Sequence, residues 1–155
     1  MSSIHVTNVK DASGNAALVT ESGGVKTDKL TGITTAGSIS VVGEGNSTTT
    51  NLQQGLAKAW LNLIGTGTIA ILDSLNISGI TDDGTGLYDS AFSANMSNND
   101  YSAAAAGGES DDSGGNRSVG LRARATTGCN LRGFHDGSSA TDLADICVTM
   151  HGDLA

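Results

Sequence analysis

Proline is absent from this chain of 155 residues, and aromatic and charged residues are scarce. Only five residues are aromatic, and 15% are charged, whereas 37% are hydrophobic. A chain with so little charge and so much apolar surface is not a charged disordered tail. Its residues also lack the heptad pattern rich in Ala, Leu, Glu and Lys that a coiled coil or helical bundle needs. Instead, Gly, Ser, Thr and Asn make up 68 residues, or 44%. A folded, glycine-rich β protein remains.

The lack of proline raises a physical question about the edges of its β-sheets. Proteins usually protect sheet edges with proline, lysine or a covering segment, and this chain has only four lysines. Few aromatic residues also leave each protomer a modest core, which burial between subunits would supplement. We therefore expect sheet edges that pair with other copies of the chain, in an obligate homo-oligomer with intertwined N-terminal arms.

Cysteine is nearly absent, and long hydrophobic runs are missing. Cys129 and Cys147 have no zinc-type spacing, so we expect two free thiols, Cys129 in a loop and Cys147 in a buried strand. No apolar run approaches the roughly 20 residues that span a bilayer. The first ten residues are polar, unlike a signal peptide. We expect a soluble protein, made in the cytoplasm, without membrane insertion.

Basic residues are outnumbered, since 16 acidic residues face 8 Lys and Arg. Residues 1–55 carry four acids and three bases, whereas residues 56–155 carry twelve acids and five bases. An acidic surface repels phosphate backbones, so we expect no nucleic-acid partner. Arg122 and Arg124 alternate with small or apolar residues, which predicts a strand with one solvated or salt-bridged polar face.

Alternating and short apolar segments predict mostly strands. The expected strands cover residues 4–9, 16–19, 25–30, 38–42, 56–63, 68–72, 75–81, 87–92, 101–106, 118–126 and 145–150. Asp83 and Gly84 favour a hairpin turn, and the polar stretch 43–51 indicates a linker. We predict an all-β fold: an N-terminal extended β-arm and linker (residues 1–52), then a C-terminal antiparallel β-sandwich or small barrel (residues 53–155), a jelly-roll-like knob expected to be trimeric.

Catalytic and metal-binding patterns are weak. Asp112, Ser113 and the two following glycines echo a serine-protease loop, but no histidine base is placed for it. The neighbouring pairs His135 with Asp136 and His151 with Asp153 lack a third ligand at fixed spacing. The Asp82 and Asp83 pair lacks the ligand pattern of an EF-hand. We expect no enzyme activity, no cofactor and no metal.

Two sets of apolar residues are candidates for contacts. In the arm, the residues expected to attach to a partner are Ile4, Val6, Val9, Leu18, Val25 and Leu30. Trp60 is the only tryptophan. It could stack on a sugar of a glycan, although a core anchor or a contact between trimer subunits is the interpretation we favour.

Three stretches resemble virion proteins of tailed bacteriophages, many of them marine or cyanobacterial. In residues 53–88, the resemblance rests on Gly55 to Trp60 (GLAKAW), Gly65 to Thr68 (GTGT) and Ile80 to Tyr88 (ITDDGTGLY). The last strand, DICVTMHGD at residues 145–153, is similar to the terminal strand of the family. The opening IHVTNVKDASGN at residues 4–15 is similar to the first strand and turn of phage fibre-type proteins. Together the matches cover about half of the chain.

This resemblance implies a non-enzymatic structural protein of the virion surface, synthesised in the cytoplasm of the host bacterium. Such proteins are commonly homotrimers that dock on the particle by an N-terminal region and display a β-rich knob. The chain is short and has no repetitive shaft, which favours capsid decoration (a cement protein) or a head fibre. The implied partners are the major capsid protein or tail and vertex proteins. The alternative is a short tail fibre or a module that recognises a host surface glycan.

Overall fold

The computed structural model describes residues 30, 39–43, 45, 47–108, 115–136 and 139–155. The chain divides into two compact units, residues 1–33 and 34–155, and all described residues except Leu30 belong to the second. This second unit is almost entirely antiparallel β-structure, apart from one helical turn. The predicted all-β fold is therefore confirmed, and of the two predicted alternatives the structure is a sandwich rather than a barrel.

A short hairpin precedes the sandwich. Strand β1 (Ser40–Val42) pairs antiparallel with strand β2 (Thr49–Asn51). The end of the predicted linker 43–51 therefore forms a strand, because its β-branched threonines pair with β1, and the role of this stretch as a linker stays a prediction. The single-turn helix α1 (Leu52–Gly55) follows, and the side-chain oxygen of Asn51 caps it by accepting from the Gln54 amide at 3.1 Å.

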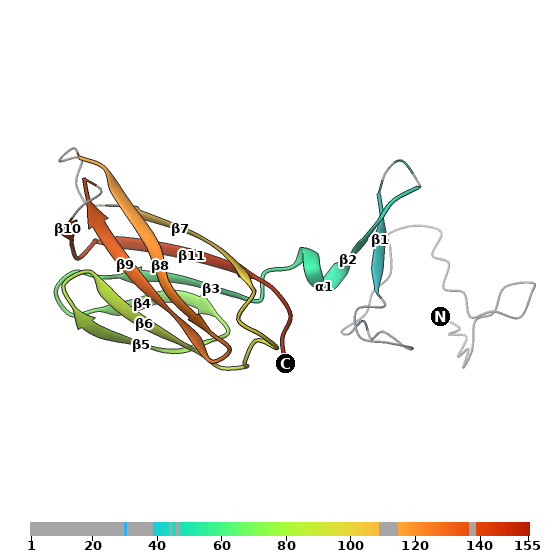
Figure 1. Ribbon diagram of the computed structural model, residues 1–155, viewed down its shortest axis with the longest axis horizontal. Helices are drawn as coiled ribbons and strands as arrows, with labels where there is room; N and C mark the ends of the chain where they lie inside the picture. The colour runs from blue at the N-terminus through green and yellow to red at the C-terminus, as the bar shows by residue number, and fades with distance from the viewer. Residues whose placement is uncertain (1–29, 31–38, 44, 46, 109–114, 137–138) are drawn as a thin grey trace, which may run out of the picture. The chain divides into compact units, whose positions relative to one another are not determined.

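Residues 59–151 form two antiparallel sheets packed face to face (Figure 1). In spatial order, sheet 1 consists of β4 (Ala70–Leu75), β3 (Ala59–Ile64), β11 (Asp145–His151) and β7 (Ser102–Gly108). Sheet 2 consists of β5 (Ile77–Gly84), β6 (Leu87–Phe92), β9 (Gly128–His135) and β8 (Arg117–Ala125), with the two-residue β10 (Ser139–Ala140) paired to the end of β9. Each sheet has one face on the shared core and one face outside.

The first and last strands of the sandwich are neighbours, so the chain enters and leaves it at the same end. Consecutive strands of the sandwich pair directly at β3–β4, β5–β6, β8–β9 and β9–β10, and the chain passes from one sheet to the other at the remaining connections. The first strand, β3, pairs with the last strand, β11, so that Ala59 lies opposite Met150. The chain therefore enters and leaves the sandwich at one end, which we call the terminal end. The β5–β6 and β7–β8 connections lie at the opposite, distal end.

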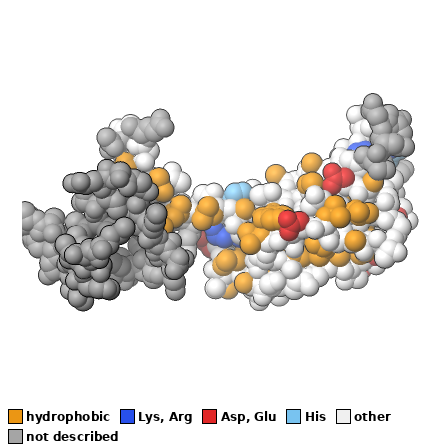
Figure 2. Space-filling view, turned by 180° about the vertical axis from the view of Figure 1, so that it is seen from behind, with side chains coloured by type: hydrophobic (Ala, Val, Ile, Leu, Met, Phe, Trp, Pro, Cys, Tyr) orange, Lys and Arg blue, Asp and Glu red, His pale blue; other side chains and the backbone are white. Residues whose placement is uncertain are grey.

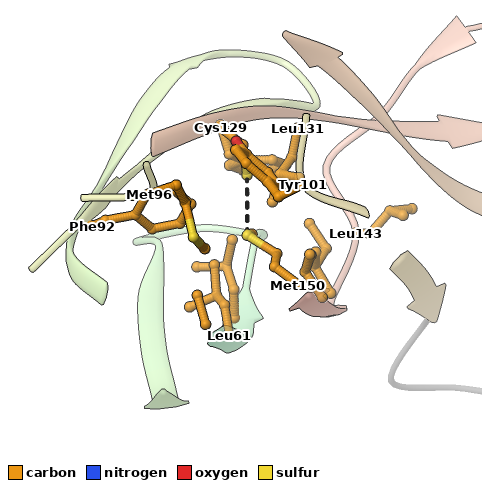
Figure 3. Packing of buried hydrophobic residues seen from close by; sticks show 13 residues of the cluster. Leu61, Phe92, Met96, Tyr101, Cys129, Leu131, Leu143 and Met150 are labelled. Carbon is orange, nitrogen blue, oxygen red and sulfur yellow. Dashed lines mark hydrogen bonds between the residues drawn. The ribbon is translucent and has the colours of Figure 1, made fainter. Parts of the chain in front are cut away.

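The core follows from strand alternation. Ala59, Leu61 and Leu63 of β3 all point inward and are buried, as the alternation in residues 56–63 predicts. Strand β11 contributes Ile146, Val148 and Met150 by the same rule. Figure 3 shows Leu61 and Met150 of sheet 1 converging on Cys129 and Leu131 of sheet 2, where the Cys129 Sγ lies 4.0 Å from the Met150 Sδ. Small residues elsewhere let these few large side chains fill the interior.

Both tyrosines of the chain are buried and have hydrogen-bond partners. Tyr88 is fully buried, and its hydroxyl lies 2.9 Å from the carbonyl oxygen of Gly65 and 3.1 Å from Oδ1 of Asp142. Tyr101 donates its hydroxyl to the carbonyl oxygen of Gly128 at 2.8 Å, in a buried position. Each tyrosine thereby ties a loop to the body of the sandwich without leaving a buried hydroxyl unsatisfied.

Three of the four edge strands are irregular. The pairing register shifts by a bulge between β3 and β4, twice between β5 and β6, and once between β8 and β9. Of the four edge strands of the described sandwich, only β7 pairs with its neighbour in an unbroken register. Bulges twist an edge away from further pairing. The fold therefore has its own protection for most edges, and pairing of edges between copies stays a prediction.

Two local predictions were wrong, and glycine is the reason in both. Strand β9 was not expected, because Gly128 and Gly133 in it look like turn residues; in the fold they let other backbone segments approach closely, with Thr141 O 2.6 Å from where a Cβ on Gly133 would lie. The β5–β6 turn lies at Thr85–Gly86, after the expected Asp83–Gly84, and Gly86 has a positive φ of 67°.

Candidate interaction surface

The outer face of sheet 1 is the main candidate for a functional surface, and we call it the sheet 1 face. Strand pairing places its side chains in rows across the four strands. The row near the terminal end is Leu75, Trp60, Thr149 and Ala104 in the order β4, β3, β11, β7. The middle row is Asp73, Asn62, Cys147 and Ala106 in the same order. In both rows the side chains become smaller from β4 and β3 toward β7.

Large hydrophobic side chains are exposed on this side of the sandwich. Leu72 and Leu75 of β4 are 58% and 46% exposed, and no described strand of sheet 2 has an exposed large hydrophobic side chain. Figure 2, which views the sandwich from the side of sheet 1, shows hydrophobic side chains spread over this face with few acidic ones among them. Exposed large hydrophobic side chains gathered on one side of a domain are a candidate for a contact site.

Trp60 lies in the sheet 1 face and not in the core. It sits on β3 between the inward-facing Ala59 and Leu61, and its side chain is partly exposed. Trp60 is therefore not an anchor of the core. The two remaining interpretations are a contact with another subunit and a contact with a glycan. Its neighbour Asn62 has a buried Oδ1 without a hydrogen-bond partner among the described residues.

The expected attachment residues of the arm mostly fall outside the described structure. Ile4, Val6, Val9, Leu18 and Val25 lie outside the described residues. Leu30 is described and is 61% exposed. Their role in attachment stays a prediction.

The outer face of sheet 2 has a different, charged character. Asp83 and Asp89 lie together there, and burial together with the hydrogen bond and charge of Asp83 raises the pKa of Asp89, an effect that nearby Arg122 opposes. The Asn130 side chain donates to Asp89. On the same sheet the Arg132 guanidinium carbon lies 4.7 Å from the Phe134 ring centroid, within the range of a cation–π contact.

The arginine strand differs from its prediction. Strand β8 exists, but the bulge after Leu121 breaks its alternation, and residues 122–125 are all exposed. Arg122 and Arg124 border a surface hollow of about 320 Å³ together with Asp100. The predicted single polar face of this strand is therefore replaced by an end of the strand that is exposed on both sides, because the bulge puts two successive side chains on one side.

The histidine pairs considered as metal ligands lie far apart along β9 and β11. His135 ends β9, and its Nε2 is 3.4 Å from Asp136 Oδ2, an ion pair only when the ring is protonated. His151 ends β11 at the terminal end, where Asp153 accepts a hydrogen bond from the Gln54 side chain. Within the part of the chain that the structure describes, no three His, Cys, Asp or Glu side chains gather as metal ligands do.

The two cysteines are free, but their expected environments are reversed. Cys129 is buried in β9, where its Sγ lies 3.2 Å from the Ser90 Oγ, whereas Cys147 is exposed on the sheet 1 face. The unexpected strand β9 explains the first, and the outward position of Cys147 between Ile146 and Val148 explains the second. Shielding from water raises the pKa of the buried Cys129 thiol. Shielding by neighbouring atoms also raises the pKa of the exposed Cys147 thiol, and the carboxylate of Asp145 adds to that rise.

We predict that a thiol reagent distinguishes these two cysteines. Cys147 should be alkylated slowly at neutral pH and faster as the pH rises, because its raised pKa keeps the reactive thiolate scarce. Cys129 should react only after unfolding. Intact-mass measurement after iodoacetamide treatment should show one addition per folded chain and two in denaturant. A Cys147→Ser variant should show none when folded; an addition there would contradict the burial of Cys129.

These features define an all-β sandwich whose sheet 1 face exposes large hydrophobic side chains and whose sheet 2 face is charged. No protein-family model, curated protein or solved structure matches the chain. Among the residues that the structure describes, no helix is long and apolar enough to span a membrane.

Proposed function

We propose that this chain is a non-enzymatic structural protein of a tailed-bacteriophage virion, a homotrimer that docks by its N-terminal arm and displays the sandwich as a surface knob. Capsid decoration or a head fibre is the preferred role, with the major capsid protein as the partner. The resemblance of residues 53–88 to phage virion proteins supports the virion role.

One structural observation supports the proposal most. The sandwich begins and ends at the same end, since Ala59 of β3 pairs with Met150 of β11. A domain held at one end presents the loops of its other end, here those after β5 and β7. This is the arrangement that a displayed knob requires.

A deletion of the gene from the phage tests this role. Virions without the protein should lose stability to heat or to low salt, because a decoration protein clamps neighbouring capsomers, while adsorption to the host should stay unchanged. Restoring the full-length protein in trans is the control. Quantitative mass spectrometry of purified virions should find copies comparable in number to the major capsid protein.

The opposite pattern would change the assignment. Particles with unchanged stability but lost adsorption, and with only a few copies of the protein, would overturn decoration and indicate the short tail fibre. Binding to a glycan that Trp60→Ala abolishes would indicate the glycan-recognition module. Absence of the protein from purified virions would overturn the virion role altogether.

A further inference from the structure

We propose that the sheet 1 face binds a second copy of this chain, with the strands of the two copies parallel and the β4–β3 half of one face packed on the β11–β7 half of the next. This inference names the contact surface of the homotrimer in the proposed function. It rests on the proposed function only for the number of copies.

The shape of the face supports a copy of itself as its occupant. Leu75 and Trp60 occupy one half of the terminal row, and Thr149 and Ala104 occupy the other. Large side chains on one half need small ones opposite them to interdigitate. Two copies related by an axis parallel to the strands meet this need, because such a rotation sets β4 of one copy against β7 of the next.

Charge favours the same relative orientation. The chain carries a formal charge of −8, so two copies repel each other unless they approach through a surface poor in charge. Asp73 is the acid of the middle row, beside Asn62, and Asp145 of β11 is exposed on the same face next to Cys147. In parallel packing Asp73 meets the small, neutral side of the partner face, around Ala106. Antiparallel packing would set Asp73 against Asp73, which like charges disfavour.

The size of the face also suits copies that are already held together. Four strands spaced about 4.8 Å apart, with six or seven residues rising about 3.3 Å each, give roughly 400 Å² per copy. A standard stable interface buries about 800 Å² per partner. A face of this size is small for an independent partner. It suffices between copies whose arms leave the sandwich at the same end, because joined arms raise the effective concentration of the knobs.

The position of the irregular edges points to the face and not to edge pairing. Strands β4, β5 and β8 carry bulges or register shifts in the described sandwich. These disrupt the continuous row of amide and carbonyl groups that edge pairing between copies would use. The regular edge strand β7 alone cannot close a trimer, because each copy of a ring needs two edges that pair. The sheet 1 face needs no such row, because side-chain packing alone would hold the copies together.

Substitution of one small residue of the face tests the inference on the full-length protein. Ala104 is exposed on the edge strand β7, so Ala104→Arg places a long charged side chain into the contact without disturbing the core. Ala123→Arg is the matched control, since Ala123 is exposed on the edge strand β8 of the other sheet. Light scattering over a dilution series should show that the wild type and Ala123→Arg stay trimeric down to the same concentration, whereas Ala104→Arg dissociates at a severalfold higher concentration.

Two further readouts check the variant and the orientation. Far-UV circular dichroism of Ala104→Arg should match the wild type, and alkylation of Cys147 should become severalfold faster, because the partner no longer covers this face. In the parallel arrangement Asp73→Asn should tighten assembly no more than Asp83→Asn, which removes an exposed acid from the other sheet. A clearly larger tightening for Asp73→Asn would overturn that arrangement.

The remaining outcomes separate this inference from the proposed function. If Ala104→Arg resisted dilution as well as the wild type and left alkylation of Cys147 equally slow, the face contact would be overturned while the trimeric virion protein stood. A wild-type dimer that Ala104→Arg dissociates would support the face contact and overturn the trimer. A folded wild-type monomer would overturn both the contact and the trimer, whereas absence from virions would affect only the virion role.

Discussion

Replacing Gly128 by alanine is expected to destabilise the sandwich strongly, although it adds only one methyl group. A Cβ at Gly128 would overlap the carbonyl oxygen of Ser90 and lie 3.2 Å from the Cα of Ala91, both on the neighbouring strand β6. These are backbone atoms of a central strand, so they cannot turn aside as a flexible side chain would. Relief requires the end of β6 to separate from the start of β9, where Ala91 pairs with Gly128.

The same displacement would disturb a second buried contact. The carbonyl oxygen of Gly128 accepts the hydroxyl proton of Tyr101, and the Tyr101 ring packs edge-on against Phe92 with 5.8 Å between the ring centroids. Overpacking of this kind costs about 3 kcal/mol at its upper range. That is a large part of the free energy of unfolding of a typical domain, about 5 to 15 kcal/mol. Chemical denaturation followed by circular dichroism measures the loss.

Gly79→Ala is the matched control for this prediction. Gly79 also lies in a strand of sheet 2, but a Cβ there meets no atom within 4 Å, and its φ is not positive. Its replacement should change the free energy of unfolding by roughly 0.5 kcal/mol or less. If Gly128→Ala proved as mild as Gly79→Ala, the close approach of β6 and β9 at this point would be contradicted.

The second large effect is expected at alkaline pH, where both tyrosines of the folded protein should keep their hydroxyl protons above the ordinary tyrosine pKa. Burial is the main cause that raises the pKa of Tyr101, to about 12 from an ordinary value of 10.0. Burial also raises the pKa of Tyr88, and the negative charge of Asp142 beside its hydroxyl raises it further. Since these are the only two tyrosines, the whole tyrosinate absorbance of the chain reports on the fold.

The direction of the stability change follows from these shifts. In the unfolded chain the tyrosines lose their protons near pH 10, whereas in the folded chain they keep them, so the unfolded state binds fewer protons above that pH. Stability is therefore complete below about pH 10 and falls as the pH rises toward the folded pKa values. For Tyr101 the shift corresponds to roughly 3 kcal/mol once both states are ionised.

An absorbance titration near 295 nm, with circular dichroism on the same samples, measures this effect. Tyrosinate should appear only as the strand signal is lost, and both tyrosines should ionise together. The denatured chain is the control and should titrate near the ordinary pKa. Tyrosinate that forms at ordinary pH while the strand signal persists would contradict the burial of the hydroxyls.

The local alternation of the sequence predicted most of the strands, because side chains of a strand alternate between two environments. In β3 this placed Ala59, Leu61 and Leu63 correctly in the core. The same rule failed at β9, where Gly128 and Gly133 resemble turn residues. Their lack of a side chain serves a close approach of other backbone segments, which are distant in sequence.

The candidate surface was only partly foreseeable. Trp60 stood out as the single tryptophan, but alternation could not decide whether its side of β3 faced a partner or a second layer of core. The exposure of Cys147 and the burial of Cys129 were predicted in reverse. Both depend on which strands pair, and pairing is decided by contacts across the fold.

The sequence by itself determined the class of this protein: an acidic, proline-free chain rich in Gly, Ser, Thr and Asn that forms antiparallel β-structure. Composition and alternation act within a few residues, so they specify strands and turns. Only the tertiary structure placed Trp60, Cys147 and Ala104 on one outer face, because strands β3, β11 and β7 are neighbours in space but not in the chain. It also decided how the sheet edges are protected, since a bulge arises where two paired strands differ in length, a property of the pair that neither segment shows alone.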